Sequence, residues 1–226
     1  RNIGYRSMCR LWSGRLQRME FLRKYKYYLR MDDDSLLTAA PRVDPFVEMG
    51  ENRWKYSYRQ PFFEAWGYDK MWEIAQKQMT EEQMDNMARM GWLVPPFGNN
   101  KSWQYIGGEP YNNYHVATVS MWSDPKWLNY LTTLEAEFGF FKHRMGDANI
   151  HAFAMGMLLQ PEEVGLKNEF PYVHNINGMP AYGYQVEKCE PRLEKEVRSV
   201  THSLEIGELG KTGRAKKNLL RVIKKE

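Results

Sequence analysis

The sequence predicts an α/β fold, in which strands and helices alternate along the chain. Segments with apolar residues three or four positions apart are typical of helices. They alternate with short aromatic and β-branched segments, which are typical of strands. Three consecutive aspartates also follow the first predicted strand, and ligands of open α/β sheets bind beyond the carboxyl ends of strands. The 226 residues suffice for one large domain or two small ones.

The first predicted element is a helix over residues 4–24, which tolerates Gly14 because apolar residues recur every three or four positions. The segment KYYLRM, residues 26–31, is the first predicted strand and leads directly into the aspartates. A short helix over 44–49 and a strand of alternating pattern over 53–59 follow.

Capping residues mark several helices in the rest of the chain. Residues 61–79 are expected to contain a helix start followed by the helix itself. The next helix is expected to begin with the capping-box pair Thr80 and Gln83. An Asp cap followed by Pro begins a helix over 124–139. The other expected elements are a loop over 92–110, a strand over 114–122, a helix over 146–159 and a loop over 172–185.

The net charge of +4 is unevenly distributed, because residues 207–226 are rich in Lys and Arg while the rest of the chain is slightly acidic. Positive charge confined to a tail does not by itself indicate nucleic-acid binding. We expect a main domain over residues 1–187 and a charged, basic C-terminal tail over 188–226, with one helical piece near 213–225.

The two cysteines, Cys9 and Cys189, lie far apart and can either pair or remain free thiols. The sequence has no apolar run of membrane-spanning length, no signal peptide and no initiator Met. We therefore expect the chain to be the interior of a longer protein.

The aspartates Asp32, Asp33 and Asp34 raise a chemical question, because adjacent carboxylates repel and lose hydration at a buried strand end. A hard divalent cation removes both costs. Alternate side chains of an extended segment point the same way, so Asp32 and Asp34 can face one pocket while Asp33 faces elsewhere. The alternative interpretation is a solvated acidic turn or a helix cap.

Two further residues are candidates for the same site. Asp147 lies at a predicted helix start, where a carboxylate either caps the helix or turns into a cleft. His174 lies in a predicted loop. An imidazole ligand suits Mn2+ better than it suits a cation that needs only oxygen ligands. A single loop histidine is usually only a surface residue, so a shared metal site needs independent support.

That support comes from a resemblance in the order of GYRSMCRLWSG, YYLRMDDDS, NNYHVATVSMW, FGFFKHRMGDANIHAFAMGMLL and YVHN. This order resembles the fungal α-1,2-mannosyltransferases of glycosyltransferase family 15, from about Tyr5 to Tyr182. The resemblance implies a GT-A-like mixed sheet flanked by helices. It also implies GDP-mannose as donor, retention of anomeric configuration, and Mn2+ or a similar divalent cation.

The resemblance also implies roles for single residues. Metal ligands would be Asp32, Asp34 and His174, and catalytic residues would be His115 and Asp147. Substrate-binding residues would be Tyr5, Arg10, Arg30 and Asp34.

Two departures from the family pattern matter. His115 stands where the family has a Glu that is proposed as nucleophile or stabiliser, and a double displacement needs a carboxylate there. Three explanations remain open: front-face departure and attack, another carboxylate such as Glu64, or loss of turnover; His115 would otherwise be a structural strand residue. The front portion of the family's domain is also absent, so we expect the first nucleotide-binding strand or strands to be missing.

The leading hypothesis is thus a metal-dependent retaining transfer of mannose from GDP-mannose to a glycan hydroxyl. The alternative is a catalytically impaired relic that binds nucleotide sugars or glycans. A nucleic-acid-binding role for the tail is the least favoured hypothesis. By resemblance, the protein would work in the Golgi lumen as a type II membrane protein whose N-terminal anchor is missing from these residues.

Overall fold

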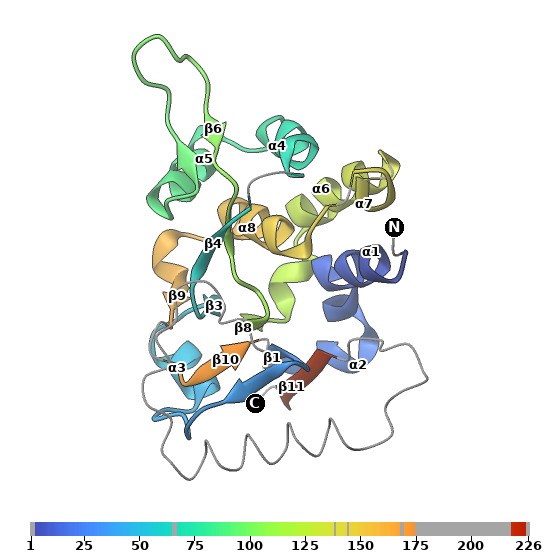
Figure 1. Cartoon of the computed structure of the whole chain (residues 1–226), viewed down its shortest axis with the longest axis vertical. Coiled ribbons are helices and arrows are strands. Elements are labelled where there is room, and N and C mark those ends of the chain that lie inside the picture. Colours follow the sequence, from blue (N-terminus) through green and yellow to red (C-terminus); the bar gives the residue numbers. More distant parts are fainter. Residues whose placement is uncertain are drawn as a thin grey trace.

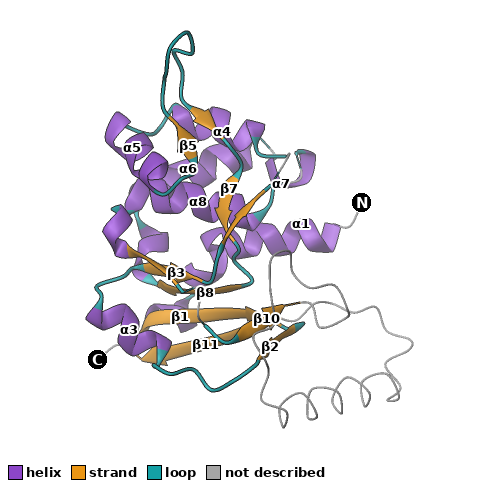
Figure 2. Cartoon of the chain, turned by 60° about the vertical axis from the view of Figure 1, so that its left-hand side comes forward, coloured by secondary structure: helices purple, strands orange, loops and turns teal. Residues whose placement is uncertain are grey.

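A computed structural model of the chain describes residues 3–64, 67–137, 139–143, 145–167, 170–174 and 218–224. A five-stranded sheet with the order β11-β1-β8-β3-β9 forms its base. Helices α1 and α4 to α8 lie on one side of this sheet, whereas α3 lies on the other side (Figures 1 and 2). The expected α/β class is therefore confirmed.

The sheet is mixed. Strand β1 (Tyr25–Asp32) lies between β8 (Tyr114–Thr118) and β11 (Asn218–Lys224) and is antiparallel to both. Strand β3 (Tyr56–Tyr58) pairs antiparallel with β8 and parallel with β9 (Val164–Leu166). The strands predicted at 26–31, 53–59 and 114–122 are confirmed, although β8 gives way to a 3-10 helix at Ser120–Ser123.

Three small ribbons lie outside this sheet. They pair β2 (Ser35–Leu37) with β10 (Tyr172–His174), β4 (Pro61–Phe63) with β7 (Gly108–Pro110), and β5 (Leu93–Val94) with β6 (Gln104–Tyr105). Several predictions were wrong here, because tertiary strand pairing overrides local pattern. The helix expected from residue 61 begins only at 69, and the loops expected over 92–110 and at 172–174 contain strands.

The helix predicted near 213–225 is also wrong, because residues 218–224 form β11 along the edge of β1. The edge of a strand offers unpaired main-chain groups to any extended segment, and the sequence NLLRVIK contains β-branched residues that favour strands. The predicted domain boundary at 187/188 and Cys189 lie outside the described residues. Cys9 is a buried free thiol.

The helix starts predicted at Asp44, Thr80 and Asp124 are confirmed. Thr80 and Gln83 form the expected capping box, and Asp44 and Asp124 accept main-chain hydrogen bonds as N-caps. The helices are α1 (Ile3–Arg10), α2 (Glu20–Arg23), α3 (Pro45–Glu51), α4 (Asp69–Gln76), α5 (Glu81–Arg89), α6 (Pro125–Ala136), α7 (Gly139–Lys142) and α8 (Asp147–Leu158). Within the described part of the chain, none of them has the length and apolarity needed to cross a membrane.

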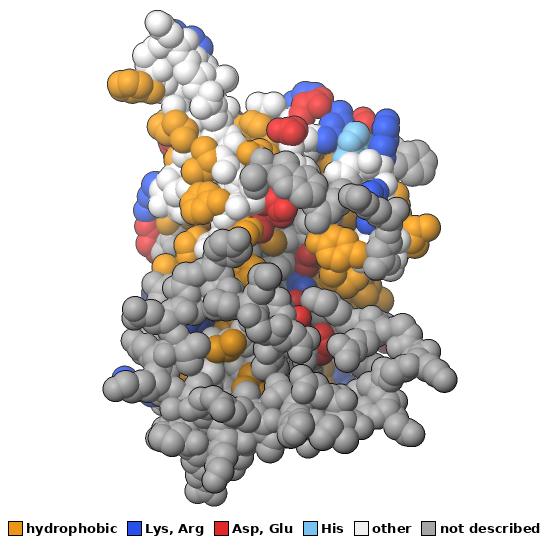
Figure 3. Space-filling model, in the orientation of Figure 1, with side chains coloured by type: hydrophobic (Ala, Val, Ile, Leu, Met, Phe, Trp, Pro, Cys, Tyr) orange, Lys and Arg blue, Asp and Glu red, His pale blue; other side chains and the backbone are white. Residues whose placement is uncertain are grey.

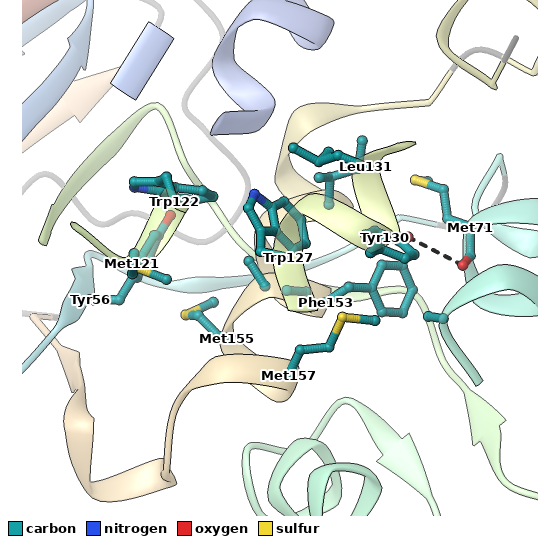
Figure 4. Close-up of a cluster of buried hydrophobic side chains, with 14 of the residues drawn as sticks. Tyr56, Met71, Met121, Trp122, Trp127, Tyr130, Leu131, Phe153, Met155 and Met157 are labelled. Carbon is teal, nitrogen blue, oxygen red and sulfur yellow. Dashed lines mark hydrogen bonds between the residues drawn. The ribbon is translucent and has the colours of Figure 1, made fainter. Parts of the chain in front are cut away.

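The main core lies between the sheet and the helices and is largely aromatic. Figure 4 shows Trp122, Trp127, Tyr130 and Phe153 gathered around α6 and α8. The Tyr130 hydroxyl donates a hydrogen bond to the main-chain oxygen of Met71 at 3.2 Å. Helix α8 is buried along nearly all its length, and its buried side chains include the polar residues Asp147, Asn149 and His151 among apolar ones.

The helix expected over residues 4–24 is interrupted near its middle. A π-helical turn (Leu11–Arg15) and a 3-10 turn (Leu16–Arg18) separate α1 from α2. Gly14 has a φ angle of +105°, a conformation that favours glycine. A Cβ atom at this position would lie 2.8 Å from Trp127 Nε1 and 3.1 Å from Trp122 Cε3. The aromatic core therefore bends the chain at Gly14.

We expect Gly14→Ala to lower the free energy of unfolding by about 2 kcal/mol or more, because it adds both backbone strain and a clash with Trp127. The matched control is Gly50→Ala in α3, where a Cβ meets no atom within 4 Å. That change should be neutral or stabilising by up to about 1 kcal/mol. Urea unfolding of both variants tests this prediction, and equal effects would contradict it.

Candidate metal and substrate site

The acidic end of β1 meets the end of β10 at the candidate metal site. Asp32 ends β1, and Asp34 lies in the turn before β2, whose Ser35 is the register partner of His174 on β10. Asp32, Asp34 and His174 each offer one ligand atom, and these three atoms lie within 4.8 Å of one another. Figure 3 shows acidic side chains near the centre of this face of the molecule.

The donor set fits a divalent cation such as Mn2+, because it combines two carboxylate oxygens with one imidazole nitrogen. His174 Nδ1 lies 3.1 Å from Asp34 Oδ1 and 3.1 Å from Ser35 Oγ. Burial raises the pKa of Asp32 to about 6, and the negative charges of Asp147 and Asp34 add to the effect although Arg30 opposes it. This cluster therefore holds crowded negative charge that a cation would neutralise. Asp33, in contrast, is exposed.

Arg30 connects this cluster to Asp147 at the start of α8. Its Nε donates to Asp32 Oδ1 at 3.1 Å, and its Nη1 donates to Asp147 Oδ2 at 2.5 Å. The guanidinium is buried and its Cζ lies 4.4 Å from the ring centroid of Trp12. The Asn112 amide also donates to Asp147 Oδ2, at 3.0 Å. Burial would raise the pKa of Asp147, but the positive charge of Arg30 and these hydrogen bonds lower it.

Two predicted substrate-binding residues, Arg10 and Tyr5, lie on α1 and have different surroundings. Arg10 forms a two-nitrogen salt bridge with Glu135 on α6, with Nε and Nη2 at 2.7 and 2.6 Å from its carboxylate. Its guanidinium is thus held against α6 by Glu135. Tyr5 is 42% exposed on the same helix. The substrate-binding roles of Tyr5 and Arg10 stay predictions.

His115 lies on β8 opposite Arg30, on the helix-covered face of the sheet, and is completely buried. Its Nδ1 donates to the main-chain oxygen of Asn112 at 2.9 Å. Its Nε2 accepts from the Tyr28 hydroxyl at 2.9 Å, and Tyr28 in turn accepts from Gln17. Burial, His151 and Arg30 hold the pKa of His115 well below its usual range. Both ring nitrogens are engaged within the protein, which favours the structural interpretation over a catalytic one.

His151 on α8 completes a buried polar network that the sequence analysis missed. Its Nε2 donates to the main-chain oxygen of Trp12 and its Nδ1 accepts from the Tyr56 hydroxyl, both at 2.9 Å. The Tyr56 ring stacks on His115 with centroids 5.1 Å apart. Burial lowers the pKa of His151 to about 4, although the Asp147 charge opposes this effect. Two neutral imidazoles, His115 and His151, thus hold the main-chain oxygens of Asn112 and Trp12 beside Arg30 and Asp147.

Asn112, Trp12 and Ser35 were also missed. Asn112 and Trp12 reach the site on segments distant in sequence from Asp32, whereas Ser35 follows Asp34 directly and its role depends on the pairing with His174. Asn112 and Asn113 lie just before β8, and an adjacent asparagine pair before a strand is a weak signal that polar side chains face a site. Trp12 looked like one of many core residues, and nothing in the local pattern distinguishes it.

Comparison with known proteins provides independent information. A family model described as glycolipid 2-alpha-mannosyltransferase matches residues 2–197. The Saccharomyces cerevisiae glycolipid 2-alpha-mannosyltransferase is 28% identical over 199 residues, which cover 85% of this chain and 41% of that protein. The Candida albicans glycolipid 2-alpha-mannosyltransferase 1 is 28% identical over 177 residues, covering 75% and 39% respectively. The chain thus spans less than half the length of these relatives.

Solved structures show the same fold. The Mn/GDP form of core-mannan synthase A from Aspergillus fumigatus has a TM-score of 0.60 at 21% identity, covering 75% of this chain and 48% of that one. The Ktr4p mannosyltransferase of S. cerevisiae in complex with GDP has a TM-score of 0.61 at 17% identity, covering 88% and 56%. The expected GT-A-like mixed sheet flanked by helices is thereby confirmed.

We expect the free energy of unfolding to fall as the pH is lowered from about 6.5 towards 4. The folded-state pKa of His151 is about 4, so an unfolded His151 binds a proton in this range and a folded one does not. His115 acts in the same direction. Each imidazole can contribute up to about 1.4 kcal/mol per pH unit.

Asp32 opposes this effect, because its pKa of about 6 makes the folded state bind a proton more tightly than the unfolded state. Stability from this group therefore rises as the pH falls through 6. Urea unfolding at several pH values, with the native chain and with Asp32→Asn, separates the two contributions. The variant should show the steeper loss of stability in acid, and a flat profile in the variant would contradict the prediction.

Proposed function

The chain belongs to glycosyltransferase family 15, the glycolipid 2-alpha-mannosyltransferases, and from this premise we propose that it transfers mannose from GDP-mannose to a glycan hydroxyl. The observation that carries the proposal is the cluster of Asp32, Asp34 and His174, whose ligand atoms share a space suited to one divalent cation. The protein with the solved Mn/GDP form has the same fold. We therefore propose Mn2+ or a similar cation as the cofactor.

The proposed chemistry breaks the bond between the anomeric carbon of mannose and the oxygen of the diphosphate. The electron pair of that bond leaves with GDP, while an acceptor hydroxyl oxygen bonds to the same carbon and its proton passes to an oxygen of the departing diphosphate. A cation held by Asp32, Asp34 and His174 would supply positive charge beside the departing diphosphate. The role of the protein is to hold these three ligands, through the β2–β10 pairing and the contact from Arg30, in one fixed arrangement.

Asp147 is proposed to act at the sugar end of the donor. Its carboxylate is ionised because its pKa is lowered, and Arg30 and Asn112 hold it in place. Negative charge fixed near the sugar would favour the positive charge that develops on its anomeric carbon. Since His115 is buried with both nitrogens engaged, we favour front-face departure and attack over a double displacement at residue 115.

The second candidate function is a relic that binds nucleotide sugars without turnover, and His115 in place of the family's Glu favours it. A Golgi location with an N-terminal membrane anchor belongs to the proposal by family resemblance only. Microscopy of the tagged natural protein tests that part.

We expect Asp32→Asn, Asp34→Asn and His174→Ala each to weaken Mn2+-dependent GDP binding by at least about tenfold, because each removes one ligand. The matched control is Asp33→Asn, a change at an exposed carboxylate in the same turn, which should retain binding. Calorimetric titration of GDP with and without Mn2+ measures the effect. Equal loss in the control, or full binding in all three variants, would contradict the metal assignment.

Release of GDP from GDP-mannose in the presence of a mannoside acceptor distinguishes the transferase from the relic. The transferase hypothesis predicts acceptor-dependent GDP release that Asp147→Ala lowers by about 100-fold or more. The relic hypothesis predicts intact binding with no release in the native protein. Thermal stabilisation by a panel of nucleotide sugars identifies the donor, and GDP-mannose should stabilise most.

A further inference from the structure

The segment that joins β7 to β8 runs along the border of the site. The Tyr111 ring meets the His174 ring edge-on with centroids 5.7 Å apart, and the Asn112 amide donates to Asp147. The main-chain oxygen of Asn113 accepts from the Asp32 nitrogen at 2.9 Å. One short segment therefore touches the metal cluster and the Asp147 carboxylate together.

Two other side chains of this segment, Glu109 and Asn113, have unsatisfied polar atoms. Each residue is only 4% exposed. Among the residues that the structure describes, Glu109 Oε2 and both polar atoms of the Asn113 amide lack a hydrogen-bond partner. Buried polar atoms of folded proteins are nearly always paired, so unpaired ones beside a site indicate groups that a ligand completes.

The surroundings of Glu109 determine what its carboxyl can bind. Strand β7 pairs with β4, and this pairing sets Phe62 opposite Glu109 and places Glu64 near it. Burial and the negative charges of Glu64 and Asp147 raise the pKa of Glu109 to about 9. Tyr105 on β6 is a further titratable group beside it, and burial raises its pKa well above the usual value.

The neutral Glu109 carboxyl therefore offers one donor and one acceptor at neutral pH, as does an amide. Such groups suit the hydroxyls of a sugar, which both donate and accept. A phosphate suits this place less well, because the carboxylates of Glu64 and Asp147 lie near it. The sugar of a nucleotide-diphosphate donor is attached directly to the terminal phosphate, so it must lie next to the metal cluster.

We propose that Glu109 and Asn113 form the subsite for the transferred hexose, where they hydrogen-bond its hydroxyls while the diphosphate lies at Asp32, Asp34 and His174. This assignment rests on the proposed function. It places a carboxyl other than that of Glu64 at the sugar, away from the position of His115, and it assigns Glu109 a binding role in its neutral form.

The test measures how much more tightly the full chain binds GDP-mannose than GDP, by calorimetry with saturating Mn2+. Glu109→Leu and Asn113→Ala should each reduce this preference by about tenfold and leave the affinity for GDP within about twofold. Glu109→Gln should keep the preference, because its amide also donates and accepts. The matched control is Glu81→Gln, a change at an exposed carboxylate at the start of α5.

A pH series gives an independent readout. Raising the pH from 7 to about 9 ionises about half of the Glu109 carboxyls, so the preference for GDP-mannose should fall by up to about twofold in the native chain and not in Glu109→Gln. Thermal unfolding of every variant verifies that it is folded, and Glu109→Gln and Asn113→Ala keep the test decisive if Glu109→Leu does not fold.

Three results would overturn the subsite: an unchanged preference in Glu109→Leu and Asn113→Ala, a parallel loss of GDP affinity, or equal damage from Glu109→Gln and Glu109→Leu. A different result marks failure of the proposed function itself. In that case the native chain binds neither GDP nor GDP-mannose with Mn2+, and the subsite falls with it.

Discussion

The site depends on one buried cation, the guanidinium of Arg30. It joins two carboxylates that come from opposite ends of the domain in sequence, Asp32 at the end of β1 and Asp147 at the start of α8. Removing one partner from a buried charge pair leaves the other charge uncompensated in a medium of low dielectric constant, which is strongly unfavourable. Arg30 therefore fixes the sheet and the most buried helix relative to each other, and the same contacts orient the acidic groups of the site.

A second constraint comes from the neutral imidazoles below Arg30. His115 holds the main-chain oxygen of Asn112, whose side chain in turn holds Asp147, and His151 holds the main-chain oxygen of Trp12 beneath the guanidinium. Because these histidines are uncharged, they occupy the core next to a cation without adding a second positive charge. His115, which the resemblance sets at the position of a family carboxylate, thus holds the segment that carries Asn112.

Local patterns were sufficient for part of this architecture. Patterns of neighbouring residues predicted three elements that the structure has: the strand that ends at Asp32, the capping box at Thr80 and the helix after Gly146. The meeting of Asp32, Asp34 and His174 was expected only through family resemblance. The bend at Gly14, the strands in predicted loops and the inward direction of His115 depend on contacts between distant segments, which periodicity does not encode.

The short β2–β10 ribbon has a consequence for how the protein acquires its site during folding. Ser35 and His174 are separated by 139 positions, so this pairing closes one of the longest loops in the molecule. Contacts of such high sequence separation are entropically expensive and are made late, after local structure has formed. Asp32, Asp34 and His174 come together only when this ribbon closes, so binding of a metal ion at this proposed site would report that the chain has reached its native topology.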